Sequence, residues 1–527
     1  MKKISTLLIT LCLYANSYAQ SNLTLTAKLS YPGMSFSGMW HYVDSNGSEY
    51  ALAGISDGLR IFDITSPTNP LQVAAVAGQT SIWREVKTYS HYAYVCTESG
   101  AGTAGFDNGL QIIDLSGLPG ALTSKFYSDS ILGSLLMRGH TVTVSDNGYL
   151  YVNGTHLANG IASGVLIFNL SDPWNPVYVG NYTASYVHDC IVYNDTMISS
   201  ELGNGFAIVD VSNKANPVVL QTQPTQANFN HNTWRSDNGN ILFTADEVAD
   251  APLAAYDITD INNIELLDSY LTENTPSGEV HNVRVLNDFL ICPSYGSKVT
   301  IVDAARPDNL IETGWYPTFS NLCWDADPYL PSGNLFACDM AGNFYVFTPN
   351  YVRACYLEGI VTDSVSGWPI PNAFVEVMST LNNDSSNLDG IYKTGAAVAG
   401  TYTVNVIADN YFGKAINNVV LNNGLLTTLN VQLLPLNVSV NEVNTNLTID
   451  VFPNPLTEVS IIKLPEILAA INNLSITFFD RLGNKLMVEK VNSRQIELLK
   501  KNFISGVYFF EISDSKNVMA RGKFLVQ

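Results

Sequence analysis

A short phrase that recurs along the first two thirds of the chain constrains the fold more than any other feature. Each copy has a small residue, a β-branched or aromatic run, an Asp or Asn, and a turn that often ends in Asn-Pro. The copies begin at Gly58 (GLRIFDITSPTNP), Gly109, Gly164, Gly205, Pro252 and Lys298. A repeat of about 40 to 55 residues made of strands and turns cannot bury its apolar face alone and must stack on its neighbours. The repeat therefore predicts a β-propeller.

A second, looser phrase lies between these copies and often starts with His, as in HNTWRSDNGNILFTADE from His231. Each full unit then consists of four strands joined by turns rich in Asn, Asp and Gly. Seven copies begin at His41, Glu85, His140, His188, His231, His281 and Trp324. The last copy stops after three strands, and Leu23 to Tyr31 (LTLTAKLSY) resemble the missing fourth. We expect this N-terminal strand to close a seven-bladed ring, because closure removes exposed sheet edges.

The copies resemble LVIVD repeats, and the order of the motifs is similar to that of the choice-of-anchor B family of exported bacterial propellers. This resemblance covers about Leu23 to Asn350 and is strongest in residues 231–247. It implies a propeller fold and export from the cell, and it implies no particular chemistry.

The N-terminus has the three parts of a secretory signal. Lys2 and Lys3 precede an apolar run from Ile4 to Ala15, and the small residues Ser17 and Ala19 follow. The pattern predicts a signal peptide over residues 1–19 and a mature chain that starts near Gln20. The apolar run is too short to cross a bilayer and no other stretch is long and apolar enough, so no transmembrane segment is expected.

The composition changes after the repeats, from Leu357 onward. Short alternating strands split by Gly and Pro turns, as in GIVTDSVSGWPIPNAFVEV, predict a small β-sandwich. The stretch resembles the carboxypeptidase regulatory-like (transthyretin-like) domain, which implies a spacer or accessory role. The matching residues are Gly359, Asp363, Gly367, Pro369, Pro371, Ala373, Gly390, Tyr392, Gly400 and Tyr402.

The last segment opens with VFPNP at Val451 to Pro455 and ends with KFLVQ. It resembles the type A C-terminal sorting domain of the type IX secretion system. The residues that carry this resemblance are Pro453, Asn454, Pro455, Gly483, Gly506 and Tyr508. The resemblance implies that the type IX machinery exports the chain across the outer membrane, cleaves this domain, and releases the rest or attaches it to the cell surface.

The sequence thus predicts an all-β chain, a propeller followed by two small β-sandwiches. The expected domains are the signal peptide (1–19), the propeller (20–350), the regulatory-like sandwich (355–436), a linker (437–448) and the sorting domain (449–527).

Charge and cysteine content narrow the partners and the compartment. The net charge of −21 disfavours nucleic acid as a partner, because neutralising phosphates needs clustered Lys and Arg. Cationic partners and calcium stay open. Six cysteines remain after removal of the signal, and Cys323 with Cys338 form a possible disulfide in the last repeat. The alternative is that they are free and act as small buried hydrophobic residues.

The leading histidines are the first candidates for a site. His41, His140, His188, His231 and His281 take similar places in the repeat, so they could face one central channel. Together with Glu85, Asp189 and Asp325 they could hold a ligand or a divalent metal, since neutral imidazole and carboxylate are common ligands. The favoured alternative is that each His sets the spacing between blades, because catalysis needs different residues in different roles whereas a scaffold repeats one.

A second set of carboxylates follows the next strand and could line the rim of the channel. Its members are Glu98, Glu201, Asp246, Glu247 and Asp339. Paired carboxylates can act as acid and base in glycoside hydrolysis, but acidic residues at loop ends more commonly cap turns. Exposed tryptophans such as Trp83 and Trp174 could stack on sugars or fill gaps between blades.

Nucleophilic catalysis and nucleotide binding have little support, since the chain has no G-x-S-x-G elbow and no phosphate loop with Lys. The favoured interpretation is therefore an exported protein of the cell surface or extracellular space that binds a glycan or protein and is not an enzyme. The alternative is a metal-dependent hydrolase or lyase that uses a His-lined central channel.

Overall fold

The computed structural model describes residues 22–98, 109–272, 278–296, 298–318, 322–436, 449–469, 471, 473–514 and 518–527. The predicted signal peptide and linker lie outside these residues. The chain divides into two compact units, Met1–Ala354 and Cys355–Gln527. Nearly all regular structure is β, so the all-β prediction is confirmed. Among the described residues, no helix has the length and apolar character needed to cross a membrane.

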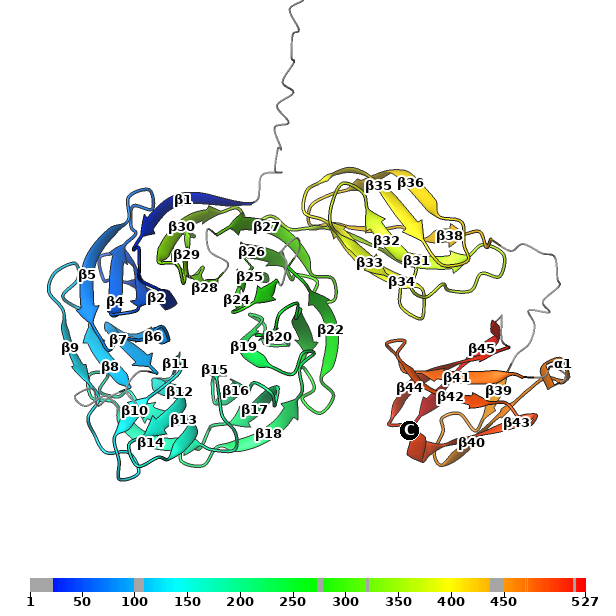
Figure 1. Cartoon of the computed structure of the whole chain (residues 1–527), viewed down its shortest axis with the longest axis horizontal. Coiled ribbons are helices and arrows are strands. Elements are labelled where there is room, and N and C mark those ends of the chain that lie inside the picture. Colours follow the sequence, from blue (N-terminus) through cyan, green and yellow to red (C-terminus); the bar gives the residue numbers. More distant parts are fainter. Residues whose placement is uncertain are drawn as a thin grey trace, which may run out of the picture. The chain divides into compact units, whose positions relative to one another are not determined.

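The first unit is a ring of antiparallel sheets around a central opening (Figure 1). The described strands form seven sheets. The first three sheets comprise β2 (Phe36–Val43), β3 (Glu49–Ile55), β4 (Gly58–Asp63) and β5 (Leu71–Ala77); β6 (Arg84–Tyr89), β7 (Tyr92–Thr97), β8 (Leu110–Asp114) and β9 (Thr123–Phe126); and β10 (Leu136–Arg138), β11 (Val142–Ser145), β12 (Tyr149–Leu157), β13 (Ala162–Asn169) and β14 (Val177–Tyr182).

The ring continues through three further sheets and a closing one. The three comprise β15 (Asp189–Tyr193), β16 (Thr196–Ser200), β17 (Phe206–Asp210) and β18 (Val218–Gln223); β19 (Asn230–Arg235), β20 (Ile241–Asp246), β21 (Leu253–Asp257) and β22 (Glu265–Tyr270); and β23 (Glu279–Val280), β24 (Arg284–Leu286), β25 (Phe289–Tyr295), β26 (Lys298–Asp303) and β27 (Ile311–Pro317). The closing sheet comprises β28 (Cys323–Asp327), β29 (Leu335–Asp339), β30 (Asn343–Pro349) and β1 (Leu23–Ser30). In Figure 1, strands such as β2, β6, β15, β19 and β28 lie toward the centre of the ring, and β5, β9, β18, β22 and β1 lie at its outer rim.

The N-terminal strand closes the ring as expected from the sequence. β1 pairs antiparallel with β30, from Leu23 opposite Pro349 to Ser30 opposite Asn343. The first and last parts of the repeat region therefore share one sheet, and β30 has a partner on each side.

The G-x-x-I-x-D strands form the scaffold because both of their faces are buried. In β4, Ile61 packs with Val86 and Val95 of the next sheet, whereas Phe62 packs with Phe336 and Phe344 of the closing sheet. Apolar cores therefore lie between neighbouring sheets all around the ring.

The Asp or Asn that ends each phrase organises the following turn, because its carboxylate or amide oxygen accepts a hydrogen bond from the backbone amide two residues later. The distances are 3.0 Å at Asp63 and 2.8 Å at Asp210 and Asp257.

The possible disulfide between Cys323 and Cys338 is not formed, and both thiols are free and buried. Cys323 packs in a cluster with Leu335 and Ala337, and Cys338 in another cluster with Phe336. Side chains of successive strand residues point to opposite faces of a sheet. The two cysteines therefore serve two different cores, as small buried hydrophobic residues.

The second unit holds two sandwiches. The first comprises β31 (Cys355–Asp363), β32 (Phe374–Val377), β33 (Asn383–Ser385), β34 (Ile391–Ala396), β35 (Gly400–Ile407), β36 (Lys414–Leu421), β37 (Leu426–Thr428) and β38 (Val431–Leu433). One sheet has the order β34-β31-β37, with β38 also on β31, and the other the order β33-β32-β35-β36. Residues such as Leu357, Val375 and Val404 fill the core between them.

The second sandwich comprises β39 (Asp450–Phe452), β40 (Val459–Lys463), α1 (Glu466–Ala469), β41 (Ser475–Phe479), β42 (Lys485–Lys490), β43 (Gln495–Leu499), a short 3-10 helix (Lys500–Asn502), β44 (Gly506–Ser513) and β45 (Val518–Val526). Its sheets have the orders β39-β40-β43 and β42-β41-β44-β45. Asn454 of the Pro-Asn-Pro motif accepts the amide of Leu525 at 2.8 Å, and Tyr508 stacks on Phe524 with ring centroids 5.6 Å apart. The motif thus ties the start of this domain to its last strand.

Candidate functional site

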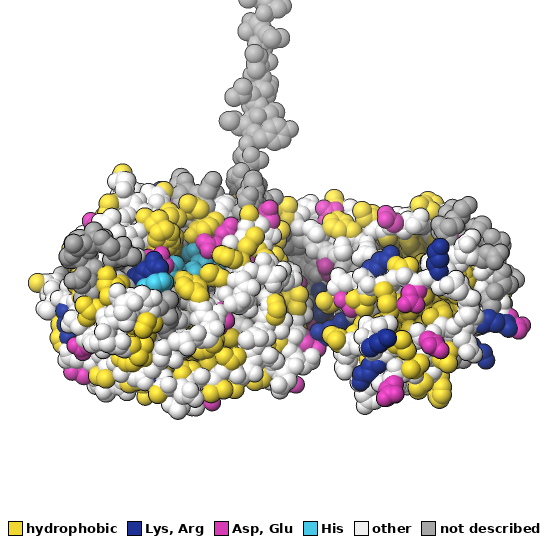
Figure 2. Space-filling view, turned by 60° about the horizontal axis from the view of Figure 1, so that its bottom comes forward, with side chains coloured by type: hydrophobic (Ala, Val, Ile, Leu, Met, Phe, Trp, Pro, Cys, Tyr) yellow, Lys and Arg dark blue, Asp and Glu magenta, His cyan; other side chains and the backbone are white. Residues whose placement is uncertain are grey.

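Four of the five candidate histidines gather at one mouth of the central opening. Neighbouring ring centroids are 4.0 Å apart for His140 and His188, 4.0 Å for His188 and His231, and 4.2 Å for His231 and His281. Together they form a continuous arc, which we call the His arc. Figure 2 shows histidine side chains at a hollow of the first unit, bordered by charged and hydrophobic side chains.

Two of these side chains are held in place by hydrogen bonds to the backbone of the next sheet. The Nδ1 atom of His188 lies 3.0 Å from the backbone oxygen of His231, and Nδ1 of His281 lies 2.7 Å from that of Trp324. A carbonyl oxygen can only accept, so Nδ1 carries the proton in both rings and Nε2 is the bare nitrogen. The scaffold role and a ligand role therefore use opposite edges of the same imidazole.

The cavity at the His arc is small, with a volume of about 20 Å³. All four histidines of the arc line it, together with Glu85 and other side chains. A cavity needs roughly 10–15 Å³ to hold one water molecule. The space therefore suits a water molecule or a single ion, and it is too small to enclose a sugar or a peptide.

His41 does not join the arc, contrary to the expectation that five histidines share one place. Its Nδ1 and its backbone amide both bond Asp327, at 2.9 and 3.0 Å. The shift has a visible cause, because β2 has an irregular register between Phe36 and Met39.

Two equivalent hydrogen bonds show which residue takes the leading place in the first sheet. Val283, two residues after His281, donates its amide to Asn232 at 2.9 Å, and Met39 donates its amide to Asp325 at 3.2 Å. Met39 therefore corresponds to Val283. Ser37, two residues before Met39, takes the position in the first sheet that His281 takes in its own sheet.

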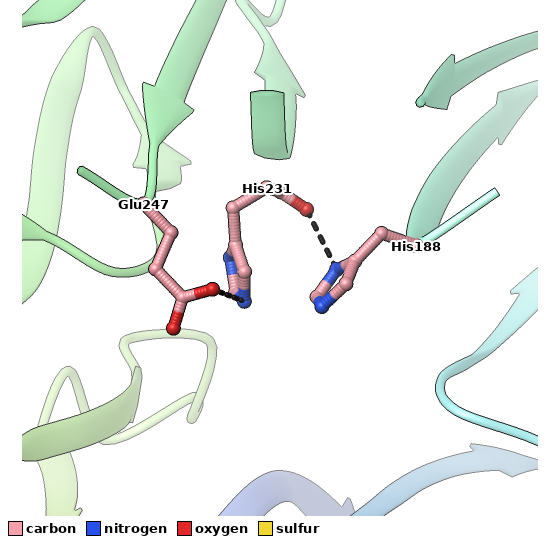
Figure 3. A group of neighbouring side chains, drawn as sticks. All are labelled: His188, His231 and Glu247. Carbon is pink, nitrogen blue, oxygen red and sulfur yellow. Dashed lines mark hydrogen bonds and ion pairs between the residues drawn. The ribbon is translucent and has the colours of Figure 1, made fainter. Parts of the chain in front are cut away.

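Two of the predicted rim carboxylates reach the arc. Glu98 lies 2.6 Å from Nδ1 of His140. Glu247 lies 3.8 Å from Nε2 of His231 and 3.8 Å from Nε2 of His281. Figure 3 shows Glu247 and the rings of His231 and His188 side by side, and donor atoms of all three residues lie within 4.8 Å of one another.

The other three rim carboxylates serve the scaffold. Glu201 accepts the hydroxyl of Tyr182 at 2.8 Å, Asp246 accepts the amide of Ala227 at 2.7 Å, and Asp339 accepts the hydroxyl of Tyr345 at 2.7 Å. The partner of Glu201 lies in β14 of the preceding sheet, and the partners of Asp246 and Asp339 lie in the same sheet as the carboxylate or in its adjoining loop, so each of the three is bonded to a scaffold residue.

The three acidic residues expected beside the leading histidines each have a polar side-chain partner. Asp189 accepts the side-chain amide of Asn232 at 2.7 Å. Glu85 forms an ion pair with Lys87, and Asp325 forms one with Arg284 at 3.2 Å. Asp189 and Glu85 line the cavity, whereas Asp325 is buried behind it.

Two basic side chains beside these acidic residues, Lys87 and Arg284, were not expected from the sequence. Lys87 lies 4.3 Å from the ring of Trp40, and Arg284 lies 4.7 Å from the ring of Trp234. Lys87 follows Glu85 by two positions and Arg284 follows Asn282 by two, and both of the earlier residues line the cavity. Side chains two apart in a strand share a face, so this spacing could have predicted the two basic residues from the sequence.

Burial sets the protonation of the arc. It lowers the pKa of His188 and His231 well below 6.5, with neighbouring imidazoles adding to the effect, and it lowers the pKa of His281 to about 3. Burial and the charge of Glu279 raise the pKa of Glu247 to about 7. The hydrogen bond with His140 and the charge of that ring lower the pKa of Glu98. His188, His231 and His281 are therefore neutral imidazoles at ordinary pH.

Comparison with known proteins identifies two segments. Residues 450–527 match the family model of the secretion system C-terminal sorting domain, and residues 201–223 match that of the LVIVD repeat. No curated protein matches the chain. The sorting domain directs the protein to the type IX secretion machinery, and so to the cell surface or the extracellular space.

Proposed function

We propose that the chain is an exported binding protein whose propeller presents its mouth to a glycan or protein ligand. In this proposal the propeller has seven blades and is of the choice-of-anchor B kind. It spans residues 20–350 and follows a signal peptide over residues 1–19. The sandwich over residues 355–436 is a carboxypeptidase regulatory-like spacer, which a linker over 437–448 joins to the sorting domain. The seven described sheets, the closure by β1 and the two-sheet form of the spacer support these assignments.

Exposed aromatic side chains at the mouth carry the proposal. Trp83 lines the same cavity as the His arc and is 42% exposed. Tyr186 is also 42% exposed, and it approaches the backbone of Gly154 beside His140. Aromatic faces stack on sugar rings and on peptide side chains. Since the cavity below holds only about 20 Å³, the ligand would lie on this rim and not inside the channel.

Binding assays with matched variants test the rim. The full chain without its signal peptide would be screened on a glycan array and in an adhesion assay, beside Trp83→Ala and Tyr186→Ala. Trp174→Ala is the control, because Trp174 lies in an outer turn where it packs against Tyr92 and Lys125. We expect at least tenfold weaker binding in the rim variants alone. Failure to find any ligand, or equal losses in Trp83→Ala and Trp174→Ala, would contradict the proposal.

A metal-dependent hydrolase or lyase is the second candidate, and one observation favours it. Glu98 and His140 form a hydrogen-bonded pair directly beside the group formed by His188, His231 and Glu247, because Nε2 of His140 lies 2.6 Å from Nε2 of His188. A carboxylate and an imidazole so placed can accept and donate a proton beside a reacting group. A panel of ester, glycoside and uronide substrates tests this candidate. Any activity that persists unchanged in His140→Gln would rule out this role for the pair.

A further inference from the structure

We propose that His188, His231 and Glu247 bind one divalent transition-metal ion, of which Zn²⁺ is the best fit, and leave a coordination position open toward the cavity. The proposal does not depend on which ligand the rim binds. It concerns a site at which two sheets contribute three donor atoms, from the start of β15, from β19 and from the end of β20 (Figure 3).

The first support is the geometry of the donor atoms. They lie within 4.8 Å of one another, and the carboxylate of Glu247 is 3.8 Å from Nε2 of His231. Zinc bonds of about 2.0–2.2 Å in a tetrahedron place neighbouring donors about 3.3 Å apart. A small rotation of the Glu247 side chain, which is 29% exposed, is enough to close that gap.

The second support is that the scaffold prepares the ligand nitrogen. Metal-binding histidines usually donate their other N–H to a carbonyl or carboxylate, which fixes the ring and its tautomer. His188 does so through Nδ1, and its acceptor is the backbone of His231, the other imidazole ligand. The backbone of His231 therefore orients the ring of His188 before any ion arrives.

The third support is the match between the cavity and the donor set. The cavity admits one water-sized group, and imidazole rings line its walls. Two nitrogen donors and one carboxylate suit Zn²⁺ or a neighbouring transition metal better than Ca²⁺, which prefers an all-oxygen shell. Three protein ligands with one open position is the arrangement of catalytic zinc sites.

Metal binding changes one contact that the structure records. The hydrogen bond between Nε2 of His140 and Nε2 of His188 must break, because the metal takes the lone pair of His188. His140 keeps its bond to Glu98 and then faces the open position of the metal. This residue would position whatever occupies that place.

The test measures metal content and affinity of the full chain without its signal peptide. The protein is stripped with a chelator, titrated with Zn²⁺ by calorimetry, and analysed for bound metal. We expect one equivalent per chain in the wild type, and at least hundredfold weaker binding in His188→Ala and in Glu247→Gln. His41→Gln is the matched control, since His41 belongs to the repeat region but bonds Asp327 away from the arc.

Cobalt substitution provides a readout that folding defects alone cannot imitate. The Co²⁺ form of the wild type should show visible ligand-field bands of nitrogen and oxygen coordination, and His41→Gln should show the same bands. Glu247→Gln keeps the size of a partly exposed side chain, so it should fold normally and yet change these bands. Absence of stoichiometric metal in the wild type, or equal affinity in Glu247→Gln and His41→Gln, overturns the proposal.

Discussion

Acid should destabilise the propeller through His281, and the structure sets the size of the effect. Burial lowers the pKa of this imidazole from 6.5 to about 3, so the folded state excludes a proton that the unfolded state binds. A depressed pKa gives stability that is full above pH 6.5 and is lost as the pH falls toward the folded value. At pH 5, which is 1.5 units below the unfolded value, the loss is about 2 kcal/mol at about 1.36 kcal/mol per unit. His188 and His231 shift in the same direction and add to it.

Denaturant unfolding at pH 7.5 and pH 5 measures this loss. Six of the seven tryptophans belong to the first unit, so tryptophan fluorescence reports mainly on the propeller. A chelator keeps the protein free of metal. The informative variant is His281→Asn, whose amide can still donate to the backbone of Trp324 but cannot titrate. Comparing the change with pH in each protein cancels any constant cost of the substitution.

We expect the free energy of unfolding to fall by about 2 kcal/mol more in the wild type than in His281→Asn between the two pH values. His91→Asn, which removes an exposed imidazole from the turn between β6 and β7, should follow the wild type. Equal changes in the wild type and His281→Asn would refute the reasoning, because the buried imidazole would then bind its proton as easily in the folded chain as in the unfolded one.

Three further predictions concern the scaffold and the export signal. Deleting residues 22–30 removes the pairing with β30, at about 1 kcal/mol per hydrogen bond, and opens a sheet edge; size-exclusion chromatography should show aggregates, and a stable monomer would contradict the closure. Arg284→Met leaves Asp325 buried without its partner and should lower the free energy of unfolding by about 3–5 kcal/mol, whereas adding Asp325→Asn should recover part of the loss; unchanged stability of the single variant would disprove the role of the pair. Deleting Val451 to Gln527 should retain the protein in the periplasm, as fractionation would reveal, and normal surface delivery would refute the assignment of the sorting domain.

The repeat predicted the strands and their order well because that information is local. Each Asp or Asn stabilises its own turn two residues later, and each apolar strand residue faces a neighbouring sheet. Closure was predictable for a related reason. The last copy lacks its fourth strand and Leu23 to Tyr31 supply one, so counting the strands in the repeats was enough to predict that the two ends of the repeat region pair.

Four of the five histidines singled out in the sequence lie side by side in the structure, and His41 does not, because a β-bulge is not visible as a pattern of residue types. An irregular register between Phe36 and Met39 moves the leading place to Ser37, a residue with no evident chemistry. The buried cations were missed for a different reason. Lys87 and Arg284 follow the two-residue period of a strand, but only the closed ring brings Lys87 beside Trp40 of another sheet, and Arg284 beside Asp325 and Trp234 of two others.

The two interpretations of the repeated histidines, scaffold and ligand, are compatible. Each imidazole has two nitrogens, and in His188 and His281 Nδ1 bonds the backbone of the next sheet while Nε2 remains for contacts within the arc. Repetition alone would still give a symmetric ring without a distinct site. The carboxylates break that symmetry, because Glu201 and Asp339 accept hydrogen bonds from the hydroxyls of scaffold tyrosines whereas Glu247 extends toward two imidazoles. A carboxylate that extends into the arc instead of bonding the scaffold is thus what turns one part of a structural arc into a place where an ion can bind.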